Sequence, residues 1–452
     1  MMRKILLISA NRLQVPYPVY PLGISYLRTA LLQHFPDSEV RVFDCNLKEN
    51  NELESTLKNF SPDYVGISFR NIDGCNSYDQ RNFIDDYKDM ISIIKSSHQC
   101  PVFIGGAGFS IYPQKLFEIL EPDFGFYGEG EVSICELIEC IEKKRDYTHI
   151  EGLVYRKNGA IIVNKRANFT RQLDVQFENQ LIDYYWKNSG MLNIQTKRGC
   201  PYHCIYCSYP LIEGRSVRTL DPDLIVENLK ELNQSKGIDY VFFTDSVFNI
   251  ENDFNNLLAE KIIKSGLKIR WGAYFSPNLL TREMLLLYKQ AGLTHIEFGT
   301  ESLCDRQLKN YGKHFTVADV IEKSQMCVDI GVYYAHFLIL GGYGETNDTL
   351  RETFENSKKI YNTVFFPFVG MRIYPGTQLQ QIAIKEGILS PDNDLIEPVY
   401  YISKHFDQST LKDEAAKTGK AWIFPDAPPD PLMEQLRIKK NKKGPIWEYL
   451  RK

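Results

Sequence analysis

Short apolar runs alternate with amphipathic stretches along the first third of the chain. The apolar runs are typical of strands buried on both faces, and the predicted strands cover residues 4–10, 40–43, 64–68, 102–104 and 124–127. Between them apolar residues recur at helical spacing, and the predicted helices cover residues 23–33, 51–59, 80–96, 131–141 and a stretch that begins near Pro113. Strands that alternate with helices of this length favour a doubly wound parallel α/β sheet with helices on both faces.

Turn-forming segments follow three of these strands. They read SFRNIDG at 68–74, GGAGFS at 105–110 and GEGE at 128–131. The carboxyl ends of parallel strands meet at one edge, where ligands bind, so we expect the glycines to let a bulky or phosphate-bearing group approach the backbone there. No GxGxxG follows the first strand, which excludes the dinucleotide fingerprint. The candidate binding residues are Ser68, Arg70, Asn71, Gly105, Gly106, Ala107, Gly108, Phe109, Gly128, Glu129 and Gly130.

A second alternation of strands and helices follows a connector. Residues 148–189 form the connector, with a predicted hairpin around a type I′ turn at Asn158-Gly159. Beyond it the predicted helices cover 223–234, 252–265, 282–291, 317–330 and 346–358. We therefore expect four regions, which are residues 1–147, 148–189, 190–395 and 396–452.

Three of the ten cysteines gather in one short segment, CPYHCIYC. Cys200, Cys204 and Cys207 follow a predicted strand, and three thiolates on one loop are suited to an iron–sulfur cluster. Such clusters normally take four cysteines, so one iron would stay open for a non-protein ligand. A zinc site with His203 as fourth ligand is the alternative, although a His adjacent to Cys204 makes tetrahedral closure awkward.

Composition and charge exclude several classes of protein. The formal net charge of −4 provides no overall basic field for nucleic acid. No apolar run approaches 18 residues, and the short apolar start is followed by polar residues, so neither a membrane span nor a signal peptide is predicted. We expect a cytoplasmic protein with no nucleic-acid or membrane partner.

The spacing CxxxCxxC, with Tyr206 just before the third cysteine, resembles the signature of radical S-adenosylmethionine (SAM) enzymes. Four later segments resemble that family in the same order: FFTDSVFN at 242–249, IEFGTES at 296–302, HFLILGGYGET at 336–346 and MRIYPGTQL at 371–379. In the third of them Tyr343 replaces the usual Pro. The resemblance implies a partial (β/α)6 TIM barrel whose three cysteines bind a 4Fe-4S cluster, with the open iron binding SAM.

The same resemblance implies roles for residues at the strand ends. Asp245 would accept a hydrogen bond from the SAM ammonium, and Glu301 or Ser302 would bond the ribose hydroxyls. Glycines and a Tyr-Pro backbone would line the adenine. The implied cofactor-binding residues of this half are Tyr206, Asp245, Glu301, Ser302, Gly341, Gly342, Tyr374 and Pro375, beside the catalytic and metal-binding Cys200, Cys204 and Cys207.

The N-terminal sheet resembles the Rossmann-like cobalamin-binding domain that precedes such barrels. The resemblance rests on PLGISYL at 21–27, DYVGIS at 63–68, VFIGGAGFS at 102–110 and FGFYGEGE at 124–131. Cobalamin domains of the mutase type carry a DxHxxG loop after the first strand, but here the loop reads NRLQVPYPVYPLG and contains no His. We therefore expect cobalamin without a protein His below the cobalt; a fold that has lost cobalamin binding is the alternative.

Together the resemblances cover about residues 1–380 and imply a cobalamin-dependent methyltransferase. It would move a methyl group from SAM via methylcobalamin to an unreactive carbon of a small-molecule or peptide substrate. A one-electron donor such as flavodoxin or ferredoxin would serve it. The alternatives are a ring-forming or rearranging radical enzyme, a methylthiotransferase, which would need a further cysteine set near the N-terminus, and a non-enzymatic carrier. Residues 396–452 are expected to cap the barrel mouth and shape the substrate pocket.

Overall fold

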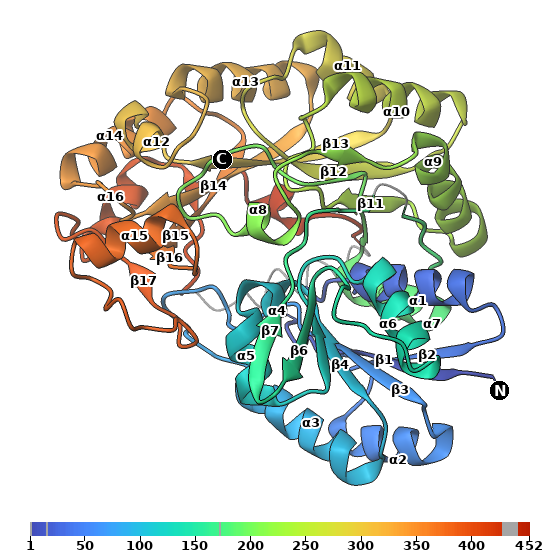
Figure 1. Cartoon of the computed structure of the whole chain (residues 1–452). Helices are drawn as coiled ribbons and strands as arrows, with labels where there is room; N and C mark the ends of the chain where they lie inside the picture. Colours follow the sequence, from blue (N-terminus) through green and yellow to red (C-terminus); the bar gives the residue numbers. More distant parts are fainter. Residues whose placement is uncertain (1, 15–16, 171–172, 427–441) are drawn as a thin grey trace. The chain divides into compact units, whose positions relative to one another are not determined.

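The computed structural model describes residues 2–14, 17–170, 173–426 and 442–452 (Figure 1). The chain forms two compact units. The N-terminal unit comprises Met1–Gly74, Arg81–Asn188 and Ser208–Gly214, and the barrel unit comprises Cys75–Gln80, Ser189–Cys207 and Arg215–Lys452. Neither unit is continuous in sequence, because Cys75–Gln80 and Ser208–Gly214 each belong to the unit that does not contain their chain neighbours.

The N-terminal unit contains a seven-stranded sheet of order β2-β1-β3-β4-β5-β6-β7. Its strands are β1 (Lys4–Ser9), β2 (Glu39–Asp44), β3 (Tyr64–Ser68), β4 (Val102–Gly105), β5 (Phe124–Phe126), β6 (Leu153–Lys157) and β7 (Ala160–Val163). The first five are parallel, as predicted, while β6 and β7 are antiparallel. Asn158 and Gly159 both have positive φ, at 49° and 83°, which is the geometry of the predicted type I′ turn.

Helices cover both faces of this sheet (Figure 1). They are α1 (Leu22–His34), α2 (Asn50–Phe60), α3 (Ile84–Ser97), α4 (Ala107–Ile111), α5 (Pro113–Leu120), α6 (Glu131–Glu142) and α7 (Asn179–Ser189). Apolar residues of α1 and α6 share one core with Ile5 and Leu7 of β1, and α2 packs against α3. β1 is buried along nearly its whole length because both its faces are covered, which explains its unbroken apolar run. The short helix α4 was not predicted from the sequence.

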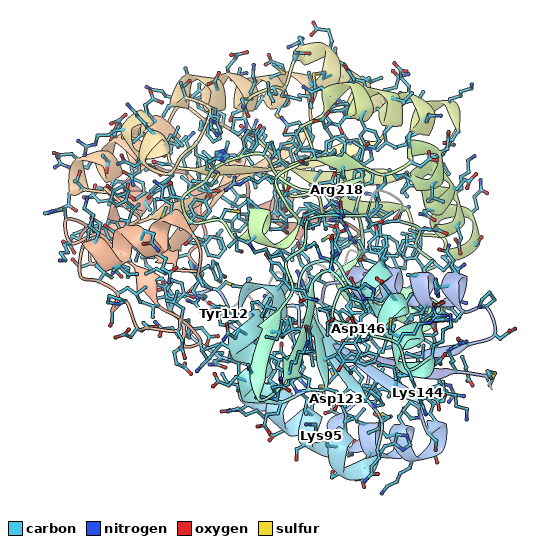
Figure 2. The ribbon with its side chains drawn as sticks, in the orientation of Figure 1. Lys95, Tyr112, Asp123, Lys144, Asp146 and Arg218 are labelled. Carbon is cyan, nitrogen blue, oxygen red and sulfur yellow. The ribbon has the colours of Figure 1, made fainter. Side chains whose placement is uncertain are left out.

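Polar groups also fix the amino ends of the strands in this unit. The Asp123 carboxylate, just before β5, accepts a hydrogen bond from the Val102 backbone N–H at 2.7 Å (Figure 2). This bond satisfies the first donor of β4 and aligns β4 with β5. The turn-forming segments lie at the opposite edge of the sheet, where the parallel strands end.

The barrel unit contains a seven-stranded sheet of order β18-β15-β14-β13-β12-β11-β8. Its strands are β8 (Leu192–Ile194), β11 (Tyr240–Phe243), β12 (Arg270–Phe275), β13 (Leu293–Glu301), β14 (Tyr333–Leu340), β15 (Thr363–Val369) and β18 (Ala421–Trp422). All neighbours are parallel, so six of them form the predicted partial barrel. The seventh, β18, comes from the C-terminal region and was not predicted. Short antiparallel pairs join β9 (Lys197–Arg198) to β10 (Arg218–Thr219) and β16 (Met371–Arg372) to β17 (Tyr400–Tyr401).

Helices follow most of these strands. They are α8 (Tyr209–Ile212), α9 (Pro222–Lys230), η1 (Glu231–Ser235), α10 (Asn252–Lys264), α11 (Arg282–Gln290), α12 (Asp305–Asn310), α13 (Val317–Ile330), α14 (Asn347–Ser357), α15 (Gln378–Lys385), α16 (Leu411–Lys417) and η2 (Ile446–Leu450). Of these, α8 belongs to the N-terminal unit. None of the helices among the described residues is long and apolar enough to cross a membrane.

The two faces of β13 have different environments. Thr300 contacts His336, which stacks on Phe298 and bonds Ser324 of α13, so these side chains face the helices. Residues two apart share a face, and Glu297 therefore lies on the inner face. There the Trp447 indole N–H donates to Glu297 Oε1 at 3.0 Å. His295 Nε2, nearer the amino end of the strand, lies 2.8 Å from Glu448 Oε2 of η2. The segment η2 thus contacts the amino-terminal half of β13, whereas residues 396–452 as a whole were expected at the barrel mouth.

Candidate active site

The cysteine loop leaves the carboxyl end of β8 and its continuation β9. Cys200 is buried, Cys204 and Cys207 are half-buried, and all three are free thiols. The Ile205 N–H donates to the Tyr311 carbonyl at 3.2 Å, and the Ile205 carbonyl accepts from the Leu379 N–H at 2.8 Å. The loop is therefore held by backbone bonds from the end of α12 and from the first turn of α15.

Gly312 shows how closely one of these segments approaches. It follows α12 with φ of +75°, and a Cβ at this position would lie 2.7 Å from the His203 carbonyl oxygen. Only glycine accommodates both the left-handed conformation and this contact. The turn after α12 therefore packs directly against the cysteine loop.

The donor set of the loop fits a cluster better than a single zinc ion. Among the described residues, no three His, Cys, Asp or Glu side chains gather closely enough to hold one metal ion. In a four-iron cluster each cysteine binds a different iron, so the thiols stand further apart than the ligands of a single ion. His203, the alternative zinc ligand, instead accepts a hydrogen bond at Nδ1 from Arg215 Nη1 at 2.7 Å.

Glu301 lies at the end of β13 beside the cysteine loop. Its Oε1 accepts a hydrogen bond from the Tyr206 hydroxyl at 2.8 Å and one from Lys313 Nζ at 3.1 Å. Its φ of 63° is unusual for a residue with a side chain, and such backbone strain concentrates at functional sites. Of the predicted residues, the structure thus brings Tyr206 and Glu301 together next to the cysteines.

Lys313 is a member of this group that the sequence analysis missed. Its side chain is only 11% exposed, and Nζ also donates to the Gly299 carbonyl at 3.3 Å. Burial lowers the pKa of Lys313, but Glu301 and then the thiols of Cys204 and Cys207 outweigh that effect and raise the pKa above its ordinary value. Lys313 therefore carries a positive charge within the electrostatic reach of the cysteine loop.

Asp245 has a different environment from the one expected of a cofactor ligand. It is fully buried, and its carboxylate accepts hydrogen bonds from Thr196 N–H at 2.7 Å, Thr196 Oγ1 at 2.5 Å and Lys197 Nζ at 2.9 Å. The ion pair lies inside the unit, and burial lowers the pKa of Lys197 although Asp245 opposes this. Instead of receiving the SAM ammonium, Asp245 holds the segment that leads into the cysteine loop.

Ser302 and the glycines after β14 likewise make contacts within the protein. The Ser302 hydroxyl is buried, accepts from the Cys304 N–H at 3.2 Å and lies 3.2 Å from Thr353 Oγ1. Gly341 donates to Glu345 Oε2 at 2.7 Å, and a Cβ on Gly342 would collide with the Tyr311 hydroxyl. Contacts within the protein thus account for a serine at position 302 and glycines at 341 and 342. That these residues also bind SAM stays a prediction.

Tyr374 and Pro375 are half-buried after β16. The Tyr374 hydroxyl lies 3.1 Å from the thiol of Cys75, and the Arg372 guanidinium lies 5.1 Å from the Tyr374 ring centroid. The side chain is thus oriented by the barrel unit itself. The predicted adenine contact of this backbone is not tested by these distances.

In the N-terminal unit, the glycines after β4 serve a close approach between two loops. A Cβ on Gly106 would lie 2.6 Å from the Phe69 carbonyl oxygen and 2.9 Å from Ser68 Oγ, and Gly108 donates to that same carbonyl at 2.9 Å. Packing against the neighbouring loop thus accounts for Gly106 and Gly108, and the predicted approach of a ligand to this backbone stays a prediction. A Cβ on Gly105 would meet only ordinary contacts.

Other predicted residues of this edge divide into core and surface. Phe109 is fully buried, so its side chain belongs to the hydrophobic core and only its backbone could meet a ligand, while Ala107 and Arg70 are exposed. Gly128 donates to Ser110 Oγ at 2.9 Å, and Glu129 Oε2 accepts from the Thr170 N–H at 2.9 Å. Gly130 directly precedes α6.

Two buried side-chain amide atoms at the same edge lack hydrogen-bond partners among the described residues. Asn71 Oδ1, after β3, and Asn11 Nδ2, after β1, have none within the described chain. The strands β1 and β3 are direct neighbours, with Ser9 opposite Ser68. Buried polar atoms are nearly always paired in native proteins, so these two orphaned groups fit an edge that binds a polar ligand. Asn71 was predicted; Asn11, which lies in the His-free loop, was not.

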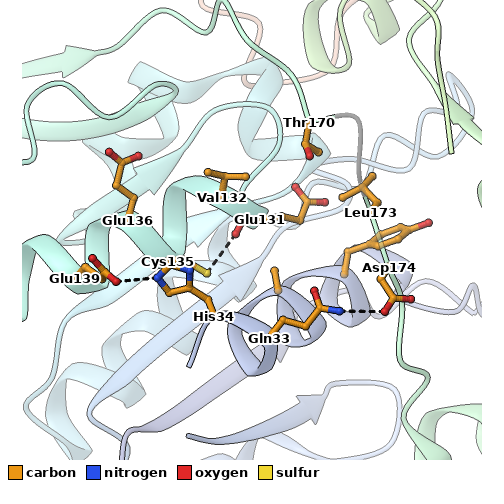
Figure 3. Close-up of a pocket in the computed structure, with 12 residues that line it drawn as sticks. Gln33, His34, Glu131, Val132, Cys135, Glu136, Glu139, Thr170, Leu173 and Asp174 are labelled. Atoms are coloured by element: carbon orange, nitrogen blue, oxygen red, sulfur yellow. Dashed lines mark hydrogen bonds and ion pairs between the residues drawn. The ribbon is translucent and has the colours of Figure 1, made fainter. Parts of the chain in front are cut away.

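A cavity of about 430 Å³ lies elsewhere in this unit, between α1 and α6 (Figure 3). His34 bonds Glu139 at 2.9 Å, and Gln33 bonds Asp174 at 3.0 Å. None of the predicted site residues lines it. The cavity is therefore separate from the strand-end residues described above.

Comparison with known proteins gives matches for both units. Residues 8–138 match the model of the B12 binding domain, and residues 194–356 match that of the Radical SAM superfamily. An uncharacterized methyltransferase of Pyrococcus horikoshii is 25% identical over 404 residues, covering 86% of this chain and 85% of that protein. Tryptophan 2-C-methyltransferase of Streptomyces laurentii is 24% identical over 446 residues, covering 83% and 74%.

Among solved structures, the radical S-adenosylmethionine methyltransferase TsrM from Kitasatospora setae, with cobalamin and a 4Fe-4S cluster bound, has the same fold. Its TM-score is 0.86 at 20% identity, and the match covers 100% of this chain and 97% of TsrM. The doubly wound sheet followed by a partial barrel is thus the fold of this chain.

Proposed function

Because the chain is a radical SAM protein with an N-terminal B12-binding domain, we propose that it methylates an unreactive carbon of a small-molecule or peptide substrate, with SAM as methyl source and cobalamin as methyl carrier. The observation that carries this proposal is the pairing, in one chain, of a three-cysteine loop with a sheet edge that holds two buried amide atoms, Asn11 Nδ2 and Asn71 Oδ1, without partners among the described residues. The methyltransferases among its relatives support the reaction class.

Cys200, Cys204 and Cys207 would hold the cluster, and Asn11, Asn71 and Arg70 lie at the edge suited to cobalamin. When bound, the cluster supplies the electron for cleaving SAM, and cobalamin supplies a carrier for the methyl group. The protein's own residues position and shield these groups. Asp245 anchors the start of the cysteine loop, and Glu301 presents a carboxylate fixed at one oxygen by Tyr206 and Lys313.

Two exposed aromatic side chains on the inner face of the barrel favour a substrate that has an apolar part. Tyr274 pairs in register with Glu297, and Phe368 pairs with Ile339 two residues beyond Phe337, so both side chains share the inner face. They are 41% and 40% exposed, unusual for aromatic side chains within strands. An apolar substrate portion would cover them.

The test of this function uses SAM with a trideuterated methyl group and the anaerobically reconstituted enzyme supplied with a one-electron donor such as flavodoxin. We expect the labelled methyl group in the extracted corrinoid, and in the product once candidate substrates are added, by mass spectrometry. The Cys204→Ala variant is the control for cluster-dependent steps. Production of 5′-deoxyadenosine with an unlabelled, rearranged product would instead establish the ring-forming alternative, and iron-free protein with stoichiometric zinc would refute the proposal.

Arg70 is the residue we assign to the lower face of the corrin. A guanidinium has no lone pair to offer, so Arg70 would fill space beside a bound corrin without ligating its cobalt. We expect electron paramagnetic resonance of the cob(II)alamin form to show no nitrogen splitting from a lower ligand, and Arg70→His to introduce such splitting. Unchanged spectra and turnover in Arg70→His and Arg70→Lys would show that Arg70 is an ordinary surface residue with no role at the corrin.

A further inference from the structure

Lys313 lies in a turn that is built into the cysteine loop. The turn follows α12, and three contacts join it to the loop: the Ile205–Tyr311 backbone bond, the close approach of Gly312 to His203, and the Tyr202 and His314 rings at 5.2 Å. A displacement of this turn would therefore move the loop. The side chain of Lys313, which lies in this turn, is buried.

The buried ammonium group of Lys313 has few polar contacts. It bonds the Glu301 carboxylate at 3.1 Å and the Gly299 carbonyl at 3.3 Å, and lies 5.7 Å from the Tyr206 ring centroid. Burying an ion is unfavourable unless the ion is paired. The pair with Glu301 offsets that cost, and the two charges cancel only as long as both are present.

The charge of a cluster's surroundings sets its reduction potential. Reduction adds one electron, so a fixed positive charge nearby stabilises the reduced form, and a negative charge destabilises it. Loss of Lys313 would remove the positive charge and leave Glu301 uncompensated beside the thiolates. Both changes act in the same direction.

We propose that Lys313 is a positioning residue that holds Glu301 beside the cysteine loop and raises the reduction potential of the cluster bound there. The proposal rests on the cluster of the proposed function. It adds a role for a residue outside the cysteine motif and explains why a lysine is buried in the turn after α12.

The test is a potentiometric titration of the reconstituted holoprotein, followed by electron paramagnetic resonance, after iron and sulfide contents have been measured. We expect Lys313→Met to shift the midpoint to a more negative value and Lys313→Arg, which keeps the charge, to stay close to the native midpoint. Lys309→Met is the matched control, because Lys309 is an exposed lysine on the preceding helix. A Lys313→Met protein with full iron content and the native midpoint would overturn the proposal.

A second variant keeps the proposal testable if Lys313→Met fails to hold its cluster. Glu301→Gln removes the opposite charge, so its midpoint should shift to a less negative value, whereas Tyr206→Phe changes no charge and should leave the midpoint in place. A negative shift, or none, in Glu301→Gln would contradict the assignment. Native protein without any cluster would refute the proposed function itself, which separates the two failures.

Discussion

Three buried ionisable side chains of the barrel unit have specific partners. Lys197 pairs with Asp245, Lys313 pairs with Glu301, and Glu297 accepts a hydrogen bond from Trp447. A buried charge is tolerated only where it is paired or neutralised. Single substitutions at these positions therefore have large and distinguishable effects.

Asp245→Asn should be strongly destabilising. It leaves Lys197, only 1% exposed, without its carboxylate, and breaking a buried pair in this way costs about 3–5 kcal/mol. Urea unfolding measures the loss, and iron content should fall with it because Thr196 and Lys197 lead into the cysteine loop. The control is Asp239→Asn, which breaks the half-exposed pair with Arg270 at a cost of about 0–1 kcal/mol. Equal losses in the two variants would contradict the structural role of Asp245.

Glu297 should make stability depend on pH. Burial raises its pKa from 4.5 to about 7, against the lowering effect of the Trp447 hydrogen bond. Between these two values the folded protein binds more protons than the unfolded chain, so the free energy of unfolding falls as pH rises through this window. Glu297→Gln removes this dependence, and its stability relative to the native protein should rise by on the order of 3 kcal/mol from pH 4.5 to pH 8. Parallel urea midpoints across that range would exclude the effect.

At the scale of elements, the carboxyl ends of the barrel strands hold one another in place. The loop after β8 is bonded to the segments after α12 and β16, which are far apart in the sequence. No single element positions the cysteines. Their geometry depends on how closely these segments pack.

Gly312→Ala should therefore reduce iron incorporation. The added Cβ meets the His203 carbonyl, and the left-handed backbone is disfavoured for alanine. Gly237→Ala is the matched control, since Gly237 has φ of +66° with nothing near its Cβ position. The control should lose only about 1–2 kcal/mol of stability and keep its iron. Similar iron contents in both variants would show that the contact with His203 does not matter.

At the scale of the whole molecule, the two sets of site residues belong to different units. The cysteines lie in the barrel unit, and Asn11, Arg70 and Asn71 lie in the N-terminal unit. Each set is held by contacts within its own unit. We therefore expect the binding of the two cofactors to be separable.

Cys204→Ala should lose iron and sulfide yet still bind hydroxocobalamin. Asn71→Ala should show the reverse, with full iron content and weakened cobalamin retention, because it removes one of the orphaned amide groups. Iron analysis and gel filtration with cobalamin absorbance measure both properties. Loss of both cofactors in either variant, with the fold intact by circular dichroism, would contradict independent sites.

The local pattern of the sequence was sufficient for much of this protein. The parallel strands are apolar runs because both their faces are covered, and the Asn158-Gly159 turn follows from backbone preferences alone. The spacing of Cys200, Cys204 and Cys207 needs no tertiary information, since the three lie on one loop. Fold class and an iron–sulfur site were predicted from such short-range features, while SAM and cobalamin were implied only by the resemblance of short segments to a known family.

Tertiary structure decided which polar groups meet. From the sequence Asp245 is predicted to be a ligand at a strand end, but in the structure it pairs with Lys197. Lys313 belongs to no motif, because its role depends on Glu301 at the end of β13. Asn11 is identified only by the lack of a partner for its Nδ2, since its Oδ1 accepts from the Leu13 N–H. The segment at Trp447 reaches the middle of β13, at Glu297, through packing between residues far apart in the chain. Local patterns determine elements and loops, but pairing and burial depend on long-range contacts that no short stretch of sequence encodes.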